Sequence, residues 1–416
     1  MSDETHIIIG TGHAGVQLAA SLREQGFDGR IVLVGEEPDL PYQRPPLSKG
    51  YLTGAVTAEG LLLRGVKFYD DRDIELLLGE PVTAIDRAAK EIELRSGRRL
   101  TYDHLTLALG VRNRPLPVPG SELDGVFGVR SLADSNRLKQ RMGDAKNIVV
   151  IGGGFIGLEL AGGAAKLGKK VTVIELAPRV MARAVTSSLS AFFENAHRQR
   201  GVEVLTSTEV ARLIGENDHV TGVELTSGRT IAADIVLFGI GVLVNSELAE
   251  AAGLEVKDGI VVDEYLRTSD PAISAIGDCA NHPNVHAGAA IRLESVQNAV
   301  DQARCVAARV MGKPVVYADV PWFWSDQSDL KLQMVGLPFG ADRTVIRGDR
   351  EGEDFSIFVF RKGKLIAVES VNRPADHMAV RALMKLGVEV TEAEIDDPQF
   401  DLRAFAQARR RAAASA

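Results

Sequence analysis

The same local pattern occurs twice in this chain, and that repetition constrains its fold more than any other feature. Near the N-terminus, THIIIG is typical of a buried strand, GTGHAG of a glycine-rich turn, AGVQLAASLREQGF of an amphipathic helix and GRIVLVGEE of a second strand. The pattern returns over residues 147–175 as NIVVIG, GGGFIG, GLELAGGAAKLG and KKVTVIE. Strand, glycine-rich turn, helix and strand in this order are typical of a dinucleotide-binding unit. The sequence therefore predicts two Rossmann-like units.

The first turn has the spacing G-x-G-x-x-G at Gly10, Gly12 and Gly15. The first glycine permits a tight turn, the second lets the backbone approach a pyrophosphate, and the third allows the helix to pack closely on the strand. The helix N-terminus offers unpaired N–H groups and a favourable dipole to the phosphates. Glu36 ends the second strand and can accept hydrogen bonds from a ribose, so we expect a complete dinucleotide site here.

The second turn repeats this design with Gly152, Gly154 and Gly157, and Glu175 ends the strand that follows. A carboxylate at that position accepts hydrogen bonds from the adenosine ribose hydroxyls and repels a 2′-phosphate. The second site is therefore predicted to prefer NADH over NADPH.

Two arginines close to that strand act against this preference. Arg179 and Arg183 follow Glu175 and could contact the pyrophosphate or simply be solvated. The predicted nucleotide site also includes Ile156, Arg183 and Gly241.

Two dinucleotide sites in one chain indicate FAD plus a nicotinamide cofactor, because two NAD sites would have no obvious chemistry between them. After residue 320 the pattern changes to the strands WFWSDQ, KLQMVG, FSIFVF and KLIAVES, followed by a helical end from about Asp376. The predicted fold class is α/β with two Rossmann-like domains and a C-terminal α+β domain. We expect an FAD domain over 1–112 and 246–320, an NAD domain over 113–245 and the C-terminal domain over 321–416.

Further flavin signals lie in the later part of the predicted FAD domain. In TSDPAISAIGDCA, Asp278 follows a buried strand and would bind ribityl hydroxyls, or alternatively cap the next loop. A helix is predicted to begin between Glu294 and Val296, and we assign both residues to the cofactor site. The positive end of this helix could stabilise the negative charge of a reduced flavin.

The chain resembles the FAD-dependent NAD(H)–ferredoxin reductases of the putidaredoxin and palustrisredoxin reductase type. The motifs that carry the resemblance are GTGHAG, PYQRPPLSKGYL, VVIGGGFIGLELA, ELAPRVMAR, TSDPAISAIGDCA, ESVQNAVDQAR and PWFWSDQ. They extend over nearly the whole chain, and the near relatives of this group include monodehydroascorbate reductase and apoptosis-inducing factor. The resemblance implies FAD and NAD domains of the glutathione-reductase type.

The resemblance also implies roles for individual residues. It places Lys49 near the flavin N5 side, paired with Glu159 beside the nicotinamide, which makes these two the predicted catalytic residues. A buried Lys–Glu pair can tune a flavin, although Glu159 alone could also be a solvated carboxylate in the first turn of a helix. The implied FAD contacts are Gly12, Ala14, Glu36, Arg44, Lys49, Val82, Arg130, Asp278 and Val296.

The two cysteines are expected to be packing residues. Cys279 and Cys305 have no C-x-x-C spacing and cannot hold an iron–sulfur cluster by thiolates alone. The histidines do not form a second pair that would complete a metal site, so no metal is expected. Electrons must then go to an external acceptor, and a [2Fe-2S] ferredoxin that supplies a cytochrome P-450 or another oxygenase fits the resemblance.

Two other functions remain open at this point. The chain could reduce a small acceptor such as monodehydroascorbate, a quinone or oxygen, or it could be a redox-sensing interaction protein that resembles apoptosis-inducing factor. Trp322 and Trp324 could be core residues or could lie near the flavin and the face that meets the redox partner.

The net charge of −8 argues against nucleic-acid binding. The apolar stretch NIVVIGGGFIGLELAGGAA is interrupted by Glu159 and by glycines, so it favours a dinucleotide turn over a membrane span. We therefore expect a cytoplasmic protein.

Overall fold

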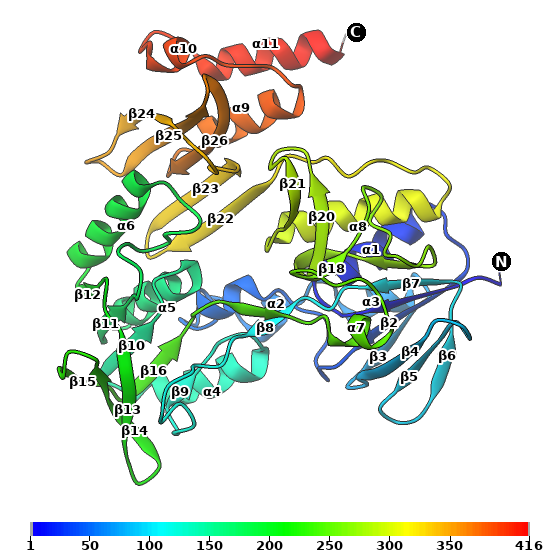
Figure 1. The fold of residues 1–416 in the computed structure, drawn as a ribbon, viewed down its shortest axis with the longest axis horizontal. Helices are drawn as coiled ribbons and strands as arrows, with labels where there is room; N and C mark the ends of the chain where they lie inside the picture. Colours follow the sequence, from blue (N-terminus) through cyan, green and yellow to red (C-terminus); the bar gives the residue numbers. More distant parts are fainter. Residues whose placement is uncertain (1–2, 415–416) are drawn as a thin grey trace. The chain divides into compact units, whose positions relative to one another are not determined.

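The computed structural model describes residues 3–414 and divides the chain into two compact units (Figure 1). Unit 1 comprises Met1–Gln43, Ala58–Arg112 and Leu243–Pro321. Unit 2 comprises Arg44–Thr57, Asn113–Val242 and Trp322–Ala416. Each unit is therefore assembled from segments that lie far apart in the sequence. The division into three domains stays a prediction.

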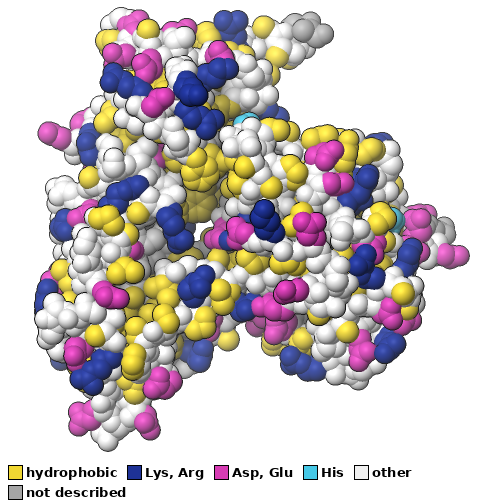
Figure 2. Space-filling model, viewed as in Figure 1, with side chains coloured by type: hydrophobic (Ala, Val, Ile, Leu, Met, Phe, Trp, Pro, Cys, Tyr) yellow, Lys and Arg dark blue, Asp and Glu magenta, His cyan; other side chains and the backbone are white. Residues whose placement is uncertain are grey.

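Acidic and basic side chains are interspersed on the face of the molecule drawn in Figure 2. This agrees with the modest excess of 56 acidic over 48 basic residues. Among the described residues, no helix is both long and apolar enough to cross a membrane.

Unit 1 is built around a parallel sheet with the strand order β19-β7-β1-β2-β3. Strands of such sheets are buried on both faces and read as continuous apolar runs, which explains THIII and RIVLVG. Helix α1 joins β1 to β2 and packs against α8 (Figure 1). These elements are β1 (Thr5–Ile9), α1 (His13–Glu24), β2 (Arg30–Gly35), β3 (Ile74–Leu78), β7 (His104–Leu107), β19 (Ile273–Ala275) and α8 (Val296–Val310).

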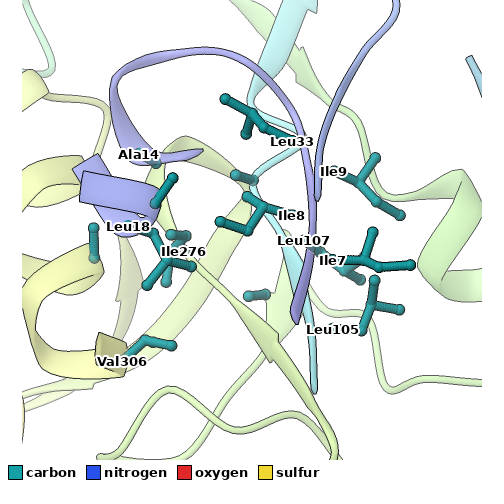
Figure 3. Close-up of a cluster of buried hydrophobic side chains, with 14 of the residues drawn as sticks. Ile7, Ile8, Ile9, Ala14, Leu18, Leu33, Leu105, Leu107, Ile276 and Val306 are labelled. Carbon is teal, nitrogen blue, oxygen red and sulfur yellow. The ribbon is translucent and has the colours of Figure 1, made fainter. Parts of the chain in front are cut away.

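The core of unit 1 lies on both faces of this sheet (Figure 3). Ile8 points towards the helices, where Leu18 of α1 and Val306 of α8 lie, whereas Ile7 and Ile9 point to the opposite face. This alternation is the period of two that a strand imposes on its side chains. It fixes β1 between two hydrophobic layers and so positions the turn that follows it.

Smaller elements complete unit 1. They are α2 (Ala58–Leu61), α3 (Val66–Asp70), the antiparallel strands β4 (Val82–Asp86), β5 (Glu91–Leu94) and β6 (Arg99–Thr101), α7 (Glu247–Ala251), β18 (Ile260–Val261), η2 (Gly277–Cys279), β20 (Ala280–Asn284) and β21 (Ala289–Arg292). The strands β8 (Val111–Asn113) and β17 (Val242–Val244) contain two of the five positions where the chain passes between the units.

Unit 2 contains a second parallel sheet with the order β12-β11-β10-β16-β9. In reverse order, β16-β10-β11-β12 repeats β7-β1-β2-β3 of the first sheet, so the predicted duplication of the Rossmann-like unit is confirmed. The edge strands differ, because β9 precedes its sheet's first βαβ unit in the chain and β19 comes last. Its elements are η1 (Pro45–Ser48), β9 (Val126–Phe127), α4 (Leu132–Met142), β10 (Asn147–Ile151), α5 (Phe155–Lys166), β11 (Lys170–Ile174), α6 (Ser187–Gln199), β12 (Val202–Leu205), β13 (Val210–Glu216), β14 (His219–Leu225), β15 (Thr230–Ala232) and β16 (Ile235–Phe238).

The C-terminal part of unit 2 is an antiparallel sheet, β22-β23-β26-β25-β24, with helices after it. Strand β22 packs against α5, so this α+β module makes direct contact with the second Rossmann-like fold. The predicted α+β character is confirmed, and the helical end begins at Pro374. The elements are β22 (Trp322–Gln327), β23 (Leu330–Gly336), β24 (Arg343–Asp349), β25 (Asp354–Arg361), β26 (Lys364–Val371), α9 (Pro374–Lys385), α10 (Glu392–Asp396) and α11 (Leu402–Ala414).

A buried carboxylate fixes β26 to the start of α6. Glu369 is fully buried, and its Oε1 accepts a hydrogen bond from the Thr186 backbone N–H at 2.8 Å. The Thr186 hydroxyl donates to Glu369 Oε2 at 2.5 Å, and the same hydroxyl accepts from Leu189 N as the N-cap of α6. Burial raises the pKa of Glu369 to about 7, and the Thr186 donors and Arg179 oppose that rise.

Glu369 should therefore make stability depend on pH. Because its pKa is raised in the folded protein, the native state keeps a proton that the unfolded chain releases between its usual pKa of 4.5 and about 7. The free energy of unfolding should fall across this window as pH rises, by about 3 kcal/mol at most. We expect Glu369→Gln to remove this slope in urea unfolding followed by circular dichroism.

Glu389→Gln is the matched control and should keep the slope. Glu389 is exposed and pairs with Lys364, which lies on the same strand as Glu369. An unchanged slope in Glu369→Gln would contradict the assignment.

Candidate functional site

The first glycine-rich turn contains glycines of two kinds. Gly10 has φ +118°, and a Cβ there would lie 2.2 Å from the Ala108 carbonyl oxygen. A Cβ at Gly15 would lie 1.9 Å from the Gly10 carbonyl oxygen. At Gly12, by contrast, φ is −79° and a Cβ would meet no described atom within 4 Å. The protein itself requires Gly10 and Gly15, whereas Gly12 leaves open space for something that is not part of the chain.

The second turn shows the same division. Gly152 has φ +104°, and its Cβ would lie 2.5 Å from the Gly239 carbonyl oxygen. A Cβ at Gly157 would lie 2.0 Å from the Gly152 carbonyl oxygen, while Gly154 again faces open space within the described chain. Both turns therefore leave room at their middle glycine, which is where a pyrophosphate would approach.

The helices after these turns begin without the usual side-chain cap. In the described structure, α1 starts after Gly12 and α5 starts after Gly154, with neither a capping side chain nor an acidic residue in the first turn. Helices α4, α6 and α8 are instead capped by Ser131, Thr186 and Ser295. Uncapped N–H groups and the positive end of the dipole suit a phosphate, so both turns fit the dinucleotides predicted for them.

A carboxylate follows the second strand of each unit, as predicted. Glu36 comes directly after β2 and is exposed. Glu175 follows β11, where its Oε2 accepts from Gly153 N at 2.6 Å and its Oε1 from Ala177 N at 2.7 Å. These two backbone hydrogen bonds orient the Glu175 carboxylate at the edge of the glycine-rich turn, and each oxygen keeps a lone pair that a ribose hydroxyl could use.

The two arginines after β11 have different environments. Arg179 donates to the carbonyl oxygens of Val185 at 3.0 Å and Ala182 at 2.6 Å, so it holds its own loop together. Arg179 is therefore not simply solvated, and its contact with a pyrophosphate stays a prediction. A Cβ built on Gly241 would lie 3.9 Å from a terminal nitrogen of Arg183, which brings these two predicted nucleotide residues together. Ile156 is 41 % exposed in the first turn of α5.

The residues predicted to bind FAD are divided between the units. In unit 1, the 3₁₀ turn η2 carries Asp278 beside the start of α1, because a Cβ at Gly277 would lie 3.2 Å from the Ala14 side chain. Glu294 lies just before α8 and pairs with Arg292 at 2.6 Å. The unit 1 members are Gly10, Gly12, Ala14, Gly15, Glu36, Val82, Asp278, Glu294 and Val296, and the unit 2 members are Arg44, Lys49 and Arg130.

Within unit 2, two of these residues are in direct contact. The guanidinium of Arg44 donates to the Arg130 carbonyl oxygen at 3.0 Å. Ser131 and Asp134 form a capping box that fixes the start of α4 immediately after Arg130. Both arginines were predicted from the family resemblance, and their contact with each other was not.

The centre of the candidate site is a buried ion pair between Lys49 and Glu159. The Lys49 Nζ lies 3.0 Å from Glu159 Oε1, and Glu159 is only 7 % exposed on α5. Ser48 donates to Glu159 Oε2 at 2.9 Å, and Ser325 donates to Oε1 at 2.5 Å. Burial raises the pKa of Glu159, while Lys49 and the two hydroxyls act in the opposite direction. The predicted pairing is observed, and a solvated Glu159 is excluded.

Ser48, Ser325 and Asp326 were not predicted to belong to this cluster. Asp326 lies 3.8 Å from the Lys49 ammonium. Ser325 and Asp326 belong to PWFWSDQ, one of the motifs that carry the family resemblance, in which functional roles were predicted only for the tryptophans. Three polar residues directly after three aromatic ones in this strand could have indicated a buried polar contact.

The tryptophans lie at the start of β22, an edge strand of the C-terminal sheet. Trp322 and Trp324 are half-buried, with ring centroids 5.6 Å apart. Trp322 also packs against the His377 ring at 5.5 Å, and the Arg381 guanidinium lies 4.5 Å from its centroid. Trp322 therefore belongs to an aromatic and cationic cluster rather than to an apolar core.

The cysteines are packing residues, as expected. Cys279 and Cys305 are both buried, and burial raises the pKa of each thiol to about 11. Neither is a thiolate at neutral pH, so neither is a nucleophile or metal ligand there. Among residues 3–414, no group of histidine, cysteine and acidic side chains could hold a metal ion.

Comparisons with known proteins agree with this arrangement. The family model described as pyridine nucleotide-disulphide oxidoreductase matches residues 4–303. The chain belongs to the pyridine nucleotide-disulphide oxidoreductase family. A second model, described as the reductase C-terminal domain, matches residues 322–406, which confirms the α+β module as a separate family element.

Within the family, the chain belongs with the ferredoxin reductases. It is 50 % identical to rhodocoxin reductase of Rhodococcus erythropolis over 397 residues. This aligned region covers 95 % of this chain and 93 % of that protein. The crystal structure of the ferredoxin reductase for the CYP199A2 system of Rhodopseudomonas palustris is 49 % identical, with a TM-score of 0.95, over 97 % of this chain and 100 % of that one.

The crystal structure of the covalent putidaredoxin reductase–putidaredoxin complex is 40 % identical, also with a TM-score of 0.95. The match covers 99 % of this chain and 100 % of that one. The protein is therefore an oxidoreductase, and reductases of this family use FAD and a nicotinamide dinucleotide, as predicted.

The open middle glycines allow the two cofactor turns to be tested separately. We expect Gly12→Ala and Gly154→Ala to leave the thermal stability of the cofactor-free protein unchanged, because each new Cβ enters open space at an allowed φ. Gly12→Ala should lower the FAD content of the purified protein. Gly154→Ala should retain FAD but weaken NADH binding at least about tenfold, measured by titration.

Gly143→Ala, which also adds a Cβ in open space but lies away from both turns, is the control for these variants. Wild-type affinity for both cofactors in the two turn variants would show that the dinucleotides bind elsewhere.

Proposed function

We propose that this protein transfers electrons from NADH through FAD to a [2Fe-2S] ferredoxin, which in turn supplies a cytochrome P-450 or another oxygenase. The observation that carries the proposal is the combination of two uncapped dinucleotide turns with a buried Lys49–Glu159 pair and no reactive thiol in the described chain. FAD, when bound, accepts two electrons from a nicotinamide and can release them singly.

The residues of the chain have distinct roles in this proposal. The turn at Gly12 would hold the FAD pyrophosphate, and Glu36 would accept hydrogen bonds from its ribose. The turn at Gly154 would hold the NADH pyrophosphate, with Glu175 on the adenosine ribose. Supporting this, both turns have open space and free helix N-termini. The FAD domain over 1–112 and 246–320, the NAD domain over 113–245 and the C-terminal domain over 321–416 belong to the same proposal.

Lys49 and Glu159 are the proposed catalytic residues. Glu159 holds the Lys49 ammonium in a fixed, partly buried position through an ion pair of 3.0 Å. A fixed cation of this kind would favour an electron-rich ring beside it and orient the ring that donates the hydride.

An external acceptor follows from the state of the cysteines. Because both thiols are buried and protonated at neutral pH, the chain has no disulfide through which electrons could leave. A [2Fe-2S] ferredoxin accepts single electrons, and several relatives are named as ferredoxin reductases, among them the reductase for the CYP199A2 system. Unpaired cysteines are also usual in a reducing compartment, so we place the protein in the cytoplasm.

The direct test is NADH-driven reduction of cytochrome c through a [2Fe-2S] ferredoxin. We expect steady turnover that requires the ferredoxin and is unchanged in the double variant Cys279→Ala/Cys305→Ala. Faster turnover with monodehydroascorbate, a quinone or oxygen would favour a small acceptor. NADH-induced dimerisation without multiple turnovers would instead favour a redox-sensing interaction protein.

The choice of nicotinamide cofactor tests Glu175. We expect kcat/KM for NADH to exceed that for NADPH by at least about tenfold, about 1.4 kcal/mol, because the carboxylate repels a 2′-phosphate. Glu175→Ala should remove most of this preference in steady-state kinetics with a fixed ferredoxin. Glu216→Ala, at an exposed glutamate of β13 in the same unit, should not. Equal use of the two cofactors by the wild type would refute the role of Glu175.

A further inference from the structure

A chain of buried polar groups leads from Glu159 into the C-terminal module. Ser325 donates to Glu159 at 2.5 Å, and the Gln327 side-chain nitrogen lies 3.4 Å from the Ser325 hydroxyl oxygen. The Gln327 side-chain oxygen lies 3.0 Å from His197 Nε2 on α6. Ser325 and Gln327 are fully buried and His197 is 1 % exposed, so water has little access to this chain.

An ionised Glu159 carboxylate would determine the direction of every hydrogen bond in this chain. Glu159 can only accept, so the Ser325 hydroxyl must donate its single hydrogen to it. The Gln327 amide must then present its NH₂ to Ser325, and the same NH₂ lies 3.5 Å from Met181 Sδ, a weak acceptor. This leaves the Gln327 oxygen facing His197, which must donate from Nε2.

The state of His197 agrees with that direction. Its Nδ1 is buried and has no hydrogen-bond partner in the described residues, as a neutral ring protonated on Nε2 requires. Burial lowers the pKa of His197, so the neutral ring is the stable form. All donors therefore point towards Glu159, and bonds aligned in this way strengthen one another.

The backbone of α5 is adapted to this contact. A Cβ on Gly162 would lie 2.6 Å from Ser328 Oγ and 3.1 Å from Ser328 N, immediately after β22. Glycine at this position of the helix lets the end of β22 approach α5 closely, although glycine weakens a helix by about 1 kcal/mol. The close approach is what brings Ser325 within hydrogen-bond distance of Glu159.

We propose that Ser325 and Gln327 are positioning residues, which hold Glu159 ionised and paired with Lys49, with His197 as the terminal donor. The C-terminal module then completes the site where the hydride is transferred, in addition to any part it has in partner docking. This inference rests on the proposed function for the role of Lys49, while the ionisation of Glu159 can be measured independently. The charged and titratable groups that face the chain are Lys49, Asp326 near Lys49, His197, and Arg200, whose charge lowers the pKa of His197.

The test is the pH titration of the Glu159 carboxyl in the FAD-loaded protein. Infrared difference spectroscopy detects the C=O stretch of a buried protonated carboxylic acid, and Glu159→Gln identifies the band that belongs to Glu159. The Ser325 hydroxyl stabilises the ionised form of Glu159 by a hydrogen bond to the charged carboxylate. Ser325→Ala should therefore move the titration midpoint to higher pH by about one pH unit. Ser325→Thr keeps the hydroxyl and should restore the wild-type midpoint.

Ser356→Ala is the matched control, because Ser356 is also fully buried in the C-terminal sheet but bonds to Ser370. It should leave the midpoint unchanged. If Ser325→Ala does not fold, Gln327→Met, which removes the amide at similar volume, should move the midpoint in the same direction by less.

The proposal would be overturned if Ser325→Ala left the titration midpoint unchanged. If Ser325→Ala does not fold, an unchanged midpoint in Gln327→Met would overturn it instead. A second readout is the pH dependence of FAD reduction by NADH in a single turnover, whose acidic limb should move by the same amount. If the carboxyl titration moves but this limb does not, Ser325 positions Glu159 and the proposed place of the pair beside the flavin is wrong. If NADH does not reduce the flavin of the wild type, the proposed function fails while the titration result stands.

Discussion

The Lys49–Glu159 ion pair is the interaction on which the rest of the candidate site depends. Its three supporting segments are far apart in the sequence: Lys49 follows η1, Glu159 lies on α5, and Ser325 lies on β22. Taking both charges out of water costs several kcal/mol, and the attraction between them repays this only when further hydrogen bonds satisfy the carboxylate. Ser48 and Ser325 supply those hydrogen bonds. A buried pair of this kind adds little to stability, which is a physical reason to assign it to function.

The glycine-rich turns show how the fold separates structural from binding requirements. The outer glycines of each turn are required because a Cβ would collide with a carbonyl oxygen at 2.5 Å or less. The middle glycines meet no such obstacle in the described chain, and the helices after them have no side-chain cap. Open space beside unsatisfied N–H groups at the start of a helix has a cost in an isolated chain, which a bound phosphate removes. The same arrangement in both units supports two dinucleotides.

Much of the fold was predictable because its signals are local. Parallel strands appear as apolar runs, the turns as spaced glycines, and the start of α8 as a change in pattern near Glu294. The pairing of Lys49 with Glu159 came only from the resemblance, since more than a hundred residues separate them. The roles of Ser325, Gln327 and Glu369 could not be predicted, because each depends on which strand of the C-terminal sheet meets which helix. The backbone contacts of Arg179 could not be predicted for the same reason, because they form only when the loop is folded.

The central claim is that Lys49 and Glu159 act as one unit. A double-mutant cycle with Lys49→Met, Glu159→Gln and the double variant tests it most directly, with the single-turnover rate constant for reduction of bound FAD by NADH as the measured quantity. If the two residues act together, each single variant should lower the rate constant by roughly tenfold or more, and the double variant should be little worse than either. Losses that multiply in the double variant would show that the two residues act independently and would contradict the account.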